Sequence, residues 1–541
     1  MAFVRRVFLR SAAALAVSPV LLGSRGTGSL PGRDTPFRHG VASGDPGPDS
    51  VLLWTRVTPP AGLLEIPVHF VVAEDPELSR IVTGGAALAR GRADFTIKVD
   101  ATGLSPGRPY YYCFAALGHR SPIGRTRTLP RGRRARLRLA VASCSSYPHG
   151  YFNGYRAIAA RSDLEAVVHL GDYLYEYENG KFGDGTALGR VPDPDRELVT
   201  LADYRRRHAQ YKSDPDLQEA HRQHPFIAVW DDHEIANNAF RSGAQNHQPW
   251  TEGSYRARRT AALRAYLEWM PVRASLSGGH VRAYRSFSFG DLVDLVMLDT
   301  RLAGRDAQLD DRCAVERGSK ARHLLGARQE RWLFERLRRS EARGARFRLI
   351  GQQVPFAPVL DPESERGCPL DSDGWDGYPA CRERILRVLD GQRLDGVVVL
   401  TGDAHSSWAN DVASDPFDRR AYDPDTGRGS RAVELVTPGI TSPGIGAPER
   451  ARTLSEAYRR ANPHVRFVDL HRRGYVLLDV TEERAQAEWY HLATVRERSD
   501  EETLSAVFLV EPRANRLVQG GEASTPDPDA PLPAPRHDPL S

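Results

Sequence analysis

The sequence predicts an α/β (α+β) protein in which a small β-sandwich precedes a larger domain of strands and helices. The chain has 541 residues, enough for several domains at about 150 residues each. Residues 35–129 contain short strand-like runs separated by Pro and Gly clusters. After residue 136, short and nearly continuous apolar runs alternate with helical patterns. That alternation is typical of a buried sheet covered by helices on its faces.

The composition excludes several classes of protein. Hydrophobic residues make up 40% and charged residues 26%, which excludes a collagenous or wholly disordered chain. Lys+Arg 74 against Asp+Glu 69 leaves a net charge of +5, too small at this length to indicate nucleic-acid binding. We therefore predict no nucleic-acid-binding module. No run of about 18 uninterrupted apolar residues is present, so we also predict no membrane span.

Residues 1–34 resemble an export signal followed by a spacer. Arg5 and Arg6 precede Phe8-Leu9, and a short apolar run from Ala12 to Leu22 follows. Paired arginines in this position are typical of the twin-arginine signal, although a chance pair in an arginine-rich chain is the alternative. The prediction is a secreted or cell-envelope protein, periplasmic or extracellular, that uses the twin-arginine translocation machinery as a partner.

The segment 35–129 is expected to form the N-terminal β-sandwich, of immunoglobulin or fibronectin type. A turn at Ser105-Pro-Gly107 precedes Tyr110, as in the tyrosine corner of immunoglobulin-like sandwiches. Residues 130–136 are basic, contain Gly132 and are expected to be a linker. The strands predicted from β-branched and aromatic residues are Val51–Val57, Val68–Ala73, Asp94–Val99 and Pro109–Leu117.

The segment 137–510 is expected to be one catalytic domain, followed by a disordered tail at 511–541 that becomes rich in Pro, Asp and Ala. A hairpin is expected at Gly474–Val480 and Gln486–His491. Helices are expected at Tyr204–His221, Tyr255–Met270 and Arg328–Arg343. The predicted buried strands are Leu137–Ala142, Ala166–Leu170, Phe226–Trp230, Leu292–Leu298, Phe347–Gly351, Val397–Thr401 and Val433–Thr437.

Most of these strands end directly in polar residues. Ligands of open α/β sheets bind beyond the carboxyl ends of the strands, so these polar groups are expected to form one site. They are Ser143-Cys144, Gly171-Asp172, Asp231-Asp232-His233, Asp299-Thr-Arg301, Gln352-Gln353 and Gly402-Asp403-Ala-His405.

The residue types at these ends are typical metal ligands. Asp172 and Tyr175 stand three residues apart, and a tyrosinate at neutral pH needs a strongly acidic cation because free phenol has a pKa of about 10. Ferric iron fits this requirement better than zinc. Cys144 would add a thiolate, and His405 an imidazole. Each residue alone has an ordinary alternative: Asp172 as a helix cap, Tyr175 as packing and Cys144 as an inert core residue.

Hard oxygen ligands follow the strand at Phe226–Trp230. Calcium or magnesium favours such oxygens, and Asp172 is a natural bridging carboxylate between two metals. A solvated surface is the alternative for this acidic motif, but the recurrence of polar groups after strands favours a joint metal site. The candidate oxygen ligands after this strand are Asp231, Asp232, Glu234, Asn237 and Asn238, and Asp403 adds a carboxylate after the strand at Val397–Thr401.

Seven motifs together resemble the PhoD family of alkaline phosphatases and phosphodiesterases, over about residues 36–495. The resemblance implies an N-terminal PhoD-type β-sandwich followed by a metallophosphoesterase sandwich that holds iron (Fe3+) and calcium (Ca2+), with an iron–tyrosinate contact. The motifs are His39–Asp45, Leu53–Val57, Ala142–Cys144, His169–Glu176, Trp230–Asn238, Gly402–His405 and Thr441–Gly444.

The same resemblance implies roles for individual residues. Asp172 would bridge the two metals, and the choices between Asp231 and Asp232 and between Asn237 and Asn238 stay open. The residues implied to face iron are Cys144, Asp172, Tyr175 and His405, and those implied to bind calcium are Asp232, Asn238 and Asp403.

The expected reaction is attack of a metal-bound hydroxide on a phosphate ester. His233 is expected to help the leaving oxygen or to hold a phosphoryl oxygen. Arg301 is a candidate bidentate clamp on phosphate, or alternatively a structural ion-pair partner.

The predicted function is an exported metal-dependent alkaline phosphatase/phosphodiesterase acting on a small-molecule or polymeric phosphate ester. One alternative keeps the site but acts on phospholipid head groups, like a phospholipase D, or on teichoic acid. Another is a non-catalytic cell-surface binding protein. The long loops Glu178–Thr200 and Leu360–Trp375 are expected to select the substrate, with Trp375 and Tyr378 either lining the pocket or simply packed.

Cys313 and Cys368 are candidates for a disulfide.

Overall fold

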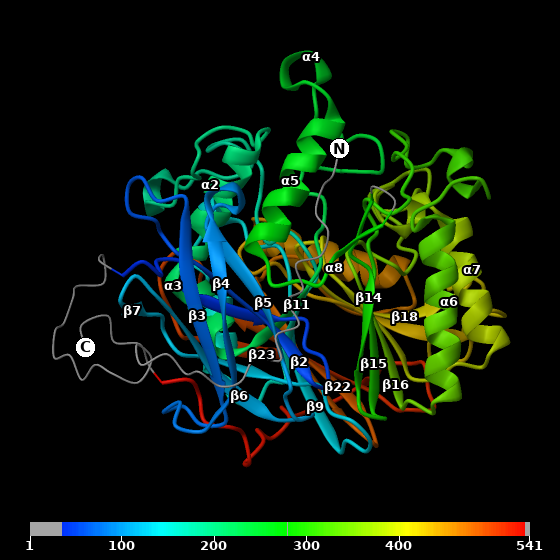
Figure 1. Ribbon diagram of the computed structural model, residues 1–541. Helices are drawn as coiled ribbons and strands as arrows, with labels where there is room; N and C mark the ends of the chain where they lie inside the picture. Colours follow the sequence, from blue (N-terminus) through cyan, green and yellow to red (C-terminus); the bar gives the residue numbers. More distant parts are fainter. Residues whose placement is uncertain (1–34, 278–279, 536–541) are drawn as a thin grey trace.

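The computed structural model describes residues 35–277 and 280–535, and two large mixed sheets dominate it. The predicted signal at 1–34 lies outside the described residues. The two sheets pack face to face, since one buried cluster includes Leu139 and Val168 of the first sheet with Leu349 and Val398 of the second. Helices cover the outer faces (Figure 1). The predicted α+β class is therefore confirmed.

The first sheet has ten strands, and its centre is parallel because β9, β10, β11 and β1 all run in one direction. Antiparallel strands extend it on both sides. In spatial order the strands are β24 (Val518–Gln519), β23 (Glu502–Val510), β22 (Ala485–Leu492), β21 (Gly474–Thr481), β9 (Arg136–Ala142), β10 (Ala166–His169), β11 (Pro225–Ala228), β1 (Val41–Gly44), β2 (Ser50–Arg56) and β5 (Thr96–Thr102).

The second sheet has seven strands, of which β15, β16, β17 and β19 are parallel. The order is β14 (Arg285–Phe289), β15 (Val293–Met297), β16 (Phe347–Gln352), β17 (Val397–Thr401), β19 (Ser430–Val436), β18 (Ser407–Ala413) and β20 (Val465–Asp469). A separate hairpin pairs β12 (Ser275–Ser277) with β13 (His280–Arg282).

Helices of the catalytic region cover the sheets. On the right of Figure 1, α6 and α7 pack on the second sheet through Leu333, Leu337, Ile385 and Leu389. The α-helices are α1 (Asn153–Ala160), α2 (Leu201–Lys212), α3 (Pro215–Gln223), α4 (Pro249–Glu252), α5 (Tyr255–Trp269), α6 (Gly326–Ala342), α7 (Pro379–Gly391) and α8 (Pro448–Ala461). The 3₁₀ turns are η2 (Gly91–Ala93), η3 (Tyr147–His149), η4 (Thr186–Leu188), η5 (Val315–Gly318) and η6 (Trp375–Gly377).

One predicted helix is wrong in its length. The pattern over Tyr204–His221 predicts a single helix, but the structure ends α2 at Lys212 and starts α3 at Pro215. Pro215 has no backbone N–H and so cannot continue a helix. The side chain of Asp214 accepts hydrogen bonds from the backbone N–H groups of Asp216 and Leu217 and so caps the new helix.

The N-terminal sandwich shares a sheet with the larger region. Its own sheet contains β4 (Ile81–Arg90), β3 (Glu65–Ala73), β6 (Pro109–Ala116), β7 (His119–Arg120) and β8 (Gly124–Arg127). Its second layer is β1, β2 and β5, and β1 pairs in parallel with β11 of the catalytic region. The tyrosine corner forms, since the backbone N–H of Ser105 donates to Tyr110 Oη at 2.8 Å.

The C-terminal segment is packed as far as residue 535, which differs from the disordered tail predicted from residue 511. Ala534 is 2% exposed, and its backbone N–H donates to Gln223 Oε1 at 2.9 Å. Carbonyl oxygens of the segment accept from buried side chains; for example, Leu532 O accepts from Tyr111 Oη at 2.6 Å. A segment rich in proline forms no regular element, but its carbonyl oxygens remain available as acceptors.

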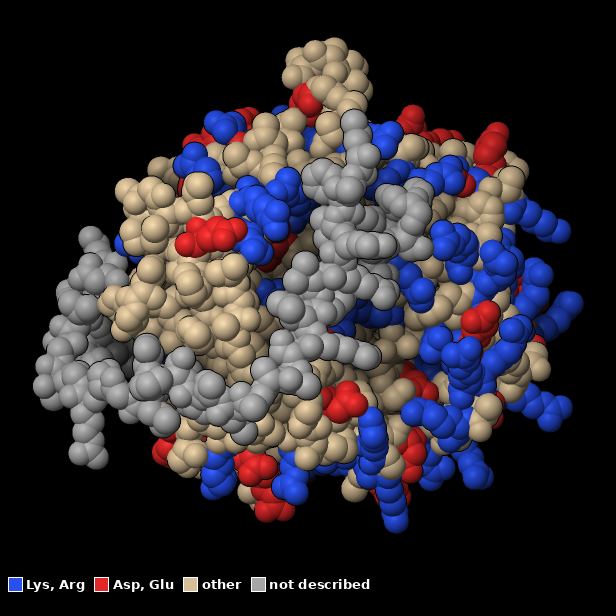
Figure 2. Space-filling model, in the orientation of Figure 1, with Lys and Arg blue, Asp and Glu red and all other residues tan. Residues whose placement is uncertain are grey.

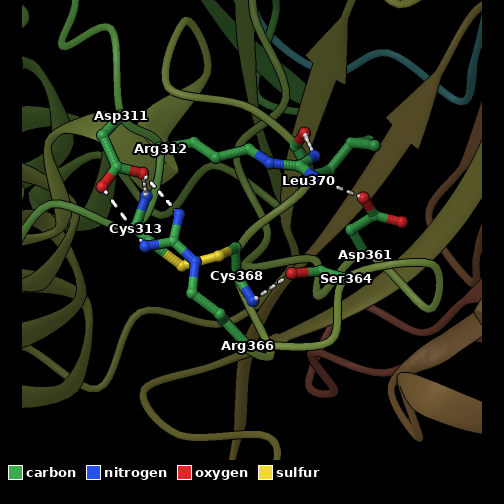
Figure 3. Close-up of a disulfide and its surroundings, with 8 residues drawn as sticks. All are labelled: Asp311, Arg312, Cys313, Asp361, Ser364, Arg366, Cys368 and Leu370. Atoms are coloured by element: carbon green, nitrogen blue, oxygen red, sulfur yellow. Dashed lines mark hydrogen bonds and ion pairs between the residues drawn. A yellow bond between two sulfur atoms is a disulfide. The ribbon is translucent and has the colours of Figure 1, made fainter.

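Cys313 and Cys368 form a disulfide, which confirms the pairing suggested by their polar surroundings. The bond ties the loop before α6 to the loop before α7, and an ion pair from Arg366 to Asp311 at 2.8 Å lies beside it (Figure 3).

In the described part of the chain, no helix combines the length and apolarity that crossing a bilayer requires.

Candidate metal centre

The polar residues that follow the parallel strands meet at one edge of the two sheets. Cys144 follows β9, Asp172 follows β10, Asp232 follows β11 and Asp403 follows β17. The first three strands belong to the ten-stranded sheet and β17 to the seven-stranded sheet. The structure therefore brings together residues that lie more than 250 positions apart in the sequence.

Three overlapping groups of side chains could each hold a metal ion. Within each group the candidate ligand atoms all lie within 4.8 Å of one another. Asp172 is common to the first two groups, and Asp232 is common to the last two. The groups are Cys144 with Asp172 and His405, Asp172 with Asp232 and His233, and Asp231 with Asp232 and Asp403.

Tyr175 lies against the first group. Its hydroxyl donates to Asp172 Oδ2 at 2.8 Å and lies 3.0 Å from His405 Nε2. Ser442 Oγ donates to the same hydroxyl at 2.7 Å, so the phenolic oxygen is held in one place by three neighbours. Ser442 belongs to the Thr441–Gly444 motif, for which the sequence alone predicts no chemical role.

Asn238 reaches the carboxylates through its backbone. Its N–H donates to Asp232 Oδ2, whereas its side-chain amide donates to Gln245 Oε1 at 2.9 Å. The backbone N–H of Asn237 instead donates to Glu176 Oε1 at 2.7 Å. Of the two asparagines, Asn238 is thus the one in direct contact with a candidate metal ligand, Asp232.

Several residues of the site have left-handed backbone conformations, which are uncommon and costly for residues other than glycine. Such strain is typical of functional sites, because the surrounding structure must hold it. Gly171, with φ +109°, allows the turn before Asp172, since a Cβ there would lie 2.4 Å from Asp231 Cβ. The left-handed residues are Cys144 (φ 60°), Asp172 (54°), Asn238 (54°), Asp403 (59°) and His405 (52°).

Arg301 is fully buried and surrounded by carboxylates. Its Nη1 donates to both oxygens of Asp373 at 2.8 and 2.9 Å, its Nη2 to Asp403 at 2.9 Å, and its Nε to Asp231. Nη2 also lies 3.4 Å from Asp232. Because every guanidinium nitrogen already has a carboxylate partner, this geometry favours the ion-pair alternative over a phosphate clamp.

Two buried glutamates hold the turns of the site in place. Glu234 accepts hydrogen bonds from the backbone N–H groups of Asp172, Tyr173 and Asp231, so both its oxygens are occupied by backbone. This contrasts with its selection from the sequence as a possible metal ligand. Glu176 lies 2.7 Å from His233 Nδ1 and orients that imidazole.

Burial and neighbouring charge shift the titration of the site. Burial, and then the negative charge of Asp172, raises the pKa of the Cys144 thiol and of the Tyr175 phenol well above their ordinary values. Burial lowers the pKa of His233, but the charges of Asp232, Glu176 and Asp172 together raise it well above its usual range. Without a cation, therefore, the thiol and the phenol keep their protons.

The donor set fits a pair of metal ions. Asp172 Oδ1 and Asp231 Oδ2 are buried carboxylate oxygens without a hydrogen-bond partner among residues 35–277 and 280–535. A buried anionic oxygen without a partner is costly, and a cation would remove that cost. The thiol, phenol and imidazole on one side suit a transition metal, and the carboxylates on the other side suit a hard cation.

Phe182 covers the tyrosine–histidine side of the site, although it is not among the site residues predicted from the sequence. Its ring stacks on Tyr175 with centroids 5.2 Å apart, and lies 6.0 Å from His405 and 6.2 Å from His233. It belongs to the loop Glu178–Thr200 that was predicted to select the substrate. The length and composition of this loop are therefore the sequence features that could have indicated Phe182.

The second predicted substrate loop contributes a charge, and its aromatic residues are packed. Asp373, which pairs with Arg301, was missed although it lies in Leu360–Trp375. Trp375 is fully buried, with its ring 4.8 Å from that of Phe356. Tyr378 is also buried, and its hydroxyl donates to Asp306 O at 2.6 Å. Of the two alternatives for Trp375 and Tyr378, packing is the observed one.

Comparisons with known proteins agree over most of the chain. The family model described as PhoD-like phosphatase matches residues 139–489, and that of its N-terminal domain matches residues 24–130. Alkaline phosphatase D of Bacillus subtilis (strain 168) is 37% identical over 507 residues, which cover 90% of this chain and 84% of the relative. A solved structure of PhoD superposes with a TM-score of 0.82 at 35% identity, covering 91% of this chain and 93% of the other.

Proposed function

Since the chain belongs to the PhoD-like phosphatase family and is a phosphoric ester hydrolase, we propose that it is an exported, metal-dependent alkaline phosphatase/phosphodiesterase. One observation supports this proposal above the others: Asp172 belongs to the first two ligand groups and Asp232 to the last two, so two cations would lie side by side. The paired arginines Arg5-Arg6 support export through the twin-arginine machinery.

We assign two metals to the site by the chemistry of the donors. Asp172, which belongs to two neighbouring ligand groups, would contribute to holding both. When bound, such ions lower the pKa of water and neutralise phosphoryl oxygens. Fe3+ would be held by Cys144, Asp172, Tyr175 and His405, and Ca2+ by Asp172, Asp232, Asn238 and Asp403.

The other residues of the site orient these groups and handle the proton. Glu176 at Nδ1 of His233 leaves Nε2 to face the substrate, where it can give a proton to the leaving oxygen. Arg301 is a positioning residue that neutralises and orients Asp231 and Asp403. Ser442 fixes the phenolic oxygen of Tyr175. The substrate is a phosphate monoester or diester whose organic group lies toward Phe182.

Asp172→Asn tests the proposal. The change keeps the side-chain volume but removes the bridging charge, so hydrolysis of p-nitrophenyl phosphate and of bis(p-nitrophenyl) phosphate should fall by at least about a thousandfold. Iron and calcium contents, measured by mass spectrometry of the purified protein, should fall with it. Asp425→Asn, on an exposed loop, is the matched control and should change neither.

Two outcomes of these measurements would contradict the proposal. Full hydrolysis by Asp172→Asn would refute the bridging role. A purified wild-type protein without iron, calcium and hydrolysis of either ester would instead favour the non-catalytic surface protein.

A further inference from the structure

A cationic pocket, distinct from the metal centre, lies between α6 and the start of the strands β15 and β16. Its volume is about 190 Å³. It is lined by the arginines Arg336, Arg339, Arg343 and Arg348 and by the serines Ser286, Ser288 and Ser340, with Asp294 as its one acidic residue. In Figure 2, Lys and Arg side chains gather on the right of the molecule, where α6 and α7 lie in Figure 1.

The positive charge of this pocket is only partly neutralised. Asp294 is held by Arg343 and by the hydroxyl of Ser288, and Arg348 pairs with Glu341 outside the pocket lining. Over the described ranges, Arg336 and Arg339 form no ion pair with a carboxylate. Burial, and then the neighbouring charges of Arg339 and Arg282, lowers the pKa of Arg336. The pocket thus holds a repulsion among like charges that an anion would relieve.

Buried donors also lack acceptors here. Ser340 Oγ, Arg336 Nε and Arg348 Nε are buried polar atoms with no hydrogen-bond partner within the described parts of the chain. Ser340 is 3% exposed and Arg348 is 4% exposed. Buried polar groups normally find partners, because an unmade hydrogen bond costs free energy. Three such atoms around one cationic cavity indicate a missing acceptor.

The pocket is separate from the metal centre. Asp294 and Arg348 are the second residues of β15 and β16, whereas Arg301 lies beyond the carboxyl end of β15. A strand of this length spans about 15 Å. An ion in the pocket is therefore remote from the reacting atoms.

We propose that this pocket is a second, non-catalytic binding site for a tetrahedral oxyanion, namely phosphate or the terminal phosphate of an organic molecule. Guanidinium groups and hydroxyls are the donors that recognise phosphate oxygens. A volume of about 190 Å³ admits a phosphate with a few waters or a small attached group. The site binds the ion released by the phosphatase reaction, but its occupancy does not depend on catalysis.

Calorimetric titration of the metal-loaded full-length enzyme with inorganic phosphate tests the site. Wild type should bind two phosphate ions, one at the metal centre and one in the pocket. Arg336→Gln should weaken the pocket site at least about tenfold, because it removes one charge-assisted donor. Arg338→Gln removes the same charge from the exposed face of the same helix and should keep both sites.

Inhibition kinetics separate this inference from the proposed function. Arg336→Gln should hydrolyse p-nitrophenyl phosphate as wild type does, with the same competitive inhibition by phosphate. Methylphosphonate distinguishes the two sources: binding in the pocket means that an organic terminal phosphate is accepted, and exclusion means that the site is for the free ion. A single phosphate bound by wild type, or a pocket site of unchanged affinity in Arg336→Gln, would overturn the inference.

Discussion

Lys212, the last residue of α2, is buried among aromatic rings. Its Nζ lies 4.9 Å from the ring centroid of Trp54 and 5.4 Å from that of Tyr173. This Nζ has no hydrogen-bond partner among the residues that the structure describes. Burial lowers the pKa of Lys212 well below its usual value, because removal from water disfavours the charged form. Folding therefore has to release a proton or bury a charge.

We predict that Lys212→Met stabilises the protein at pH 7. The unfolded chain keeps the Lys212 proton up to about pH 10.5, whereas the folded chain loses it at lower pH. The unfolded state thus binds more protons in this interval, and wild-type stability rises with pH. The advantage of Lys212→Met should shrink by about 1.4 kcal/mol for each pH unit between the two pKa values. Urea unfolding at pH 7 and pH 9 measures it.

The exposed Lys320→Met is the control for that comparison, and its effect should not change with pH. A constant difference between wild type and Lys212→Met at the two pH values would contradict the buried, deprotonated amine.

At the scale of single residues, the sequence identifies the site by residue type and by place after a strand. Cys144, Asp172 and His405 were found this way and meet in space. Asp373 and Ser442 could not be found, because their roles arise from contacts between loops that the sequence does not reveal. Arg301 was identified from the sequence, but its contacts with three carboxylates are what favour an ion-pair role over a phosphate clamp.

At the scale of elements, the loop 178–200 has a defined conformation that is held by hydrogen bonds within the loop. Asn179 donates to Asp184 Oδ1 at 2.9 Å and to Thr186 Oγ1 at 3.0 Å, and its own Oδ1 accepts from Gly185 N at 2.8 Å. Gly183 lies so close to His149 that a Cβ would be 2.4 Å from the imidazole. These contacts present Phe182 to the metal centre.

We predict that Phe182→Ala impairs binding of aryl phosphate esters more than it impairs turnover. Loss of the ring removes an apolar wall, worth about 1 kcal/mol in an aromatic contact, so KM for p-nitrophenyl phosphate should rise about fivefold. kcat should change less, because no proposed ligand or proton donor is lost. Phe182→Tyr keeps the ring and should restore KM. Steady-state kinetics of both variants would count against this role if kcat alone fell.

The elements also show what periodicity misses. Residues 81–90 form β4, although Gly84 and Gly85 are poor strand formers. The ring of Phe70 on β3 lies 2.9 Å from the position of a Cβ on Gly85, so the close neighbour favours glycine there. Pairing with β3 therefore stabilises β4 as a strand, and the local sequence pattern does not reveal that pairing.

At the scale of the whole molecule, the C-terminal segment joins the sandwich to the catalytic region. Arg138 of β9 donates to Ser524 Oγ at 3.1 Å, and Arg125 of β8 donates to Pro531 O at 3.1 Å. Gln223 of α3 exchanges hydrogen bonds with Ala534. Arg138 lies in the first half of β9 and Gln223 lies just before β11, whereas the metal centre follows the carboxyl ends of these strands.

We predict that deletion of residues 521–541 lowers thermal stability without abolishing hydrolysis. Each lost hydrogen bond costs about 1 kcal/mol, and buried donors such as those of Arg125 and Gln223 would lose acceptors. Deletion of 536–541 alone keeps the described contacts and is the control. Thermal melting and hydrolysis of p-nitrophenyl phosphate measure the two effects; equal melting temperatures for both deletions would disprove the structural role.

The fold class, the buried strands and the residue types that follow them could all be predicted from the amino-acid sequence. Those features depend on local hydrophobic patterning and on the direction of a strand. Three further features became apparent only in the folded chain: Arg301 is enclosed by carboxylates, the N-terminal strands continue the central sheet, and the tail is packed. These outcomes depend on contacts between distant segments, whose free energies no local pattern contains.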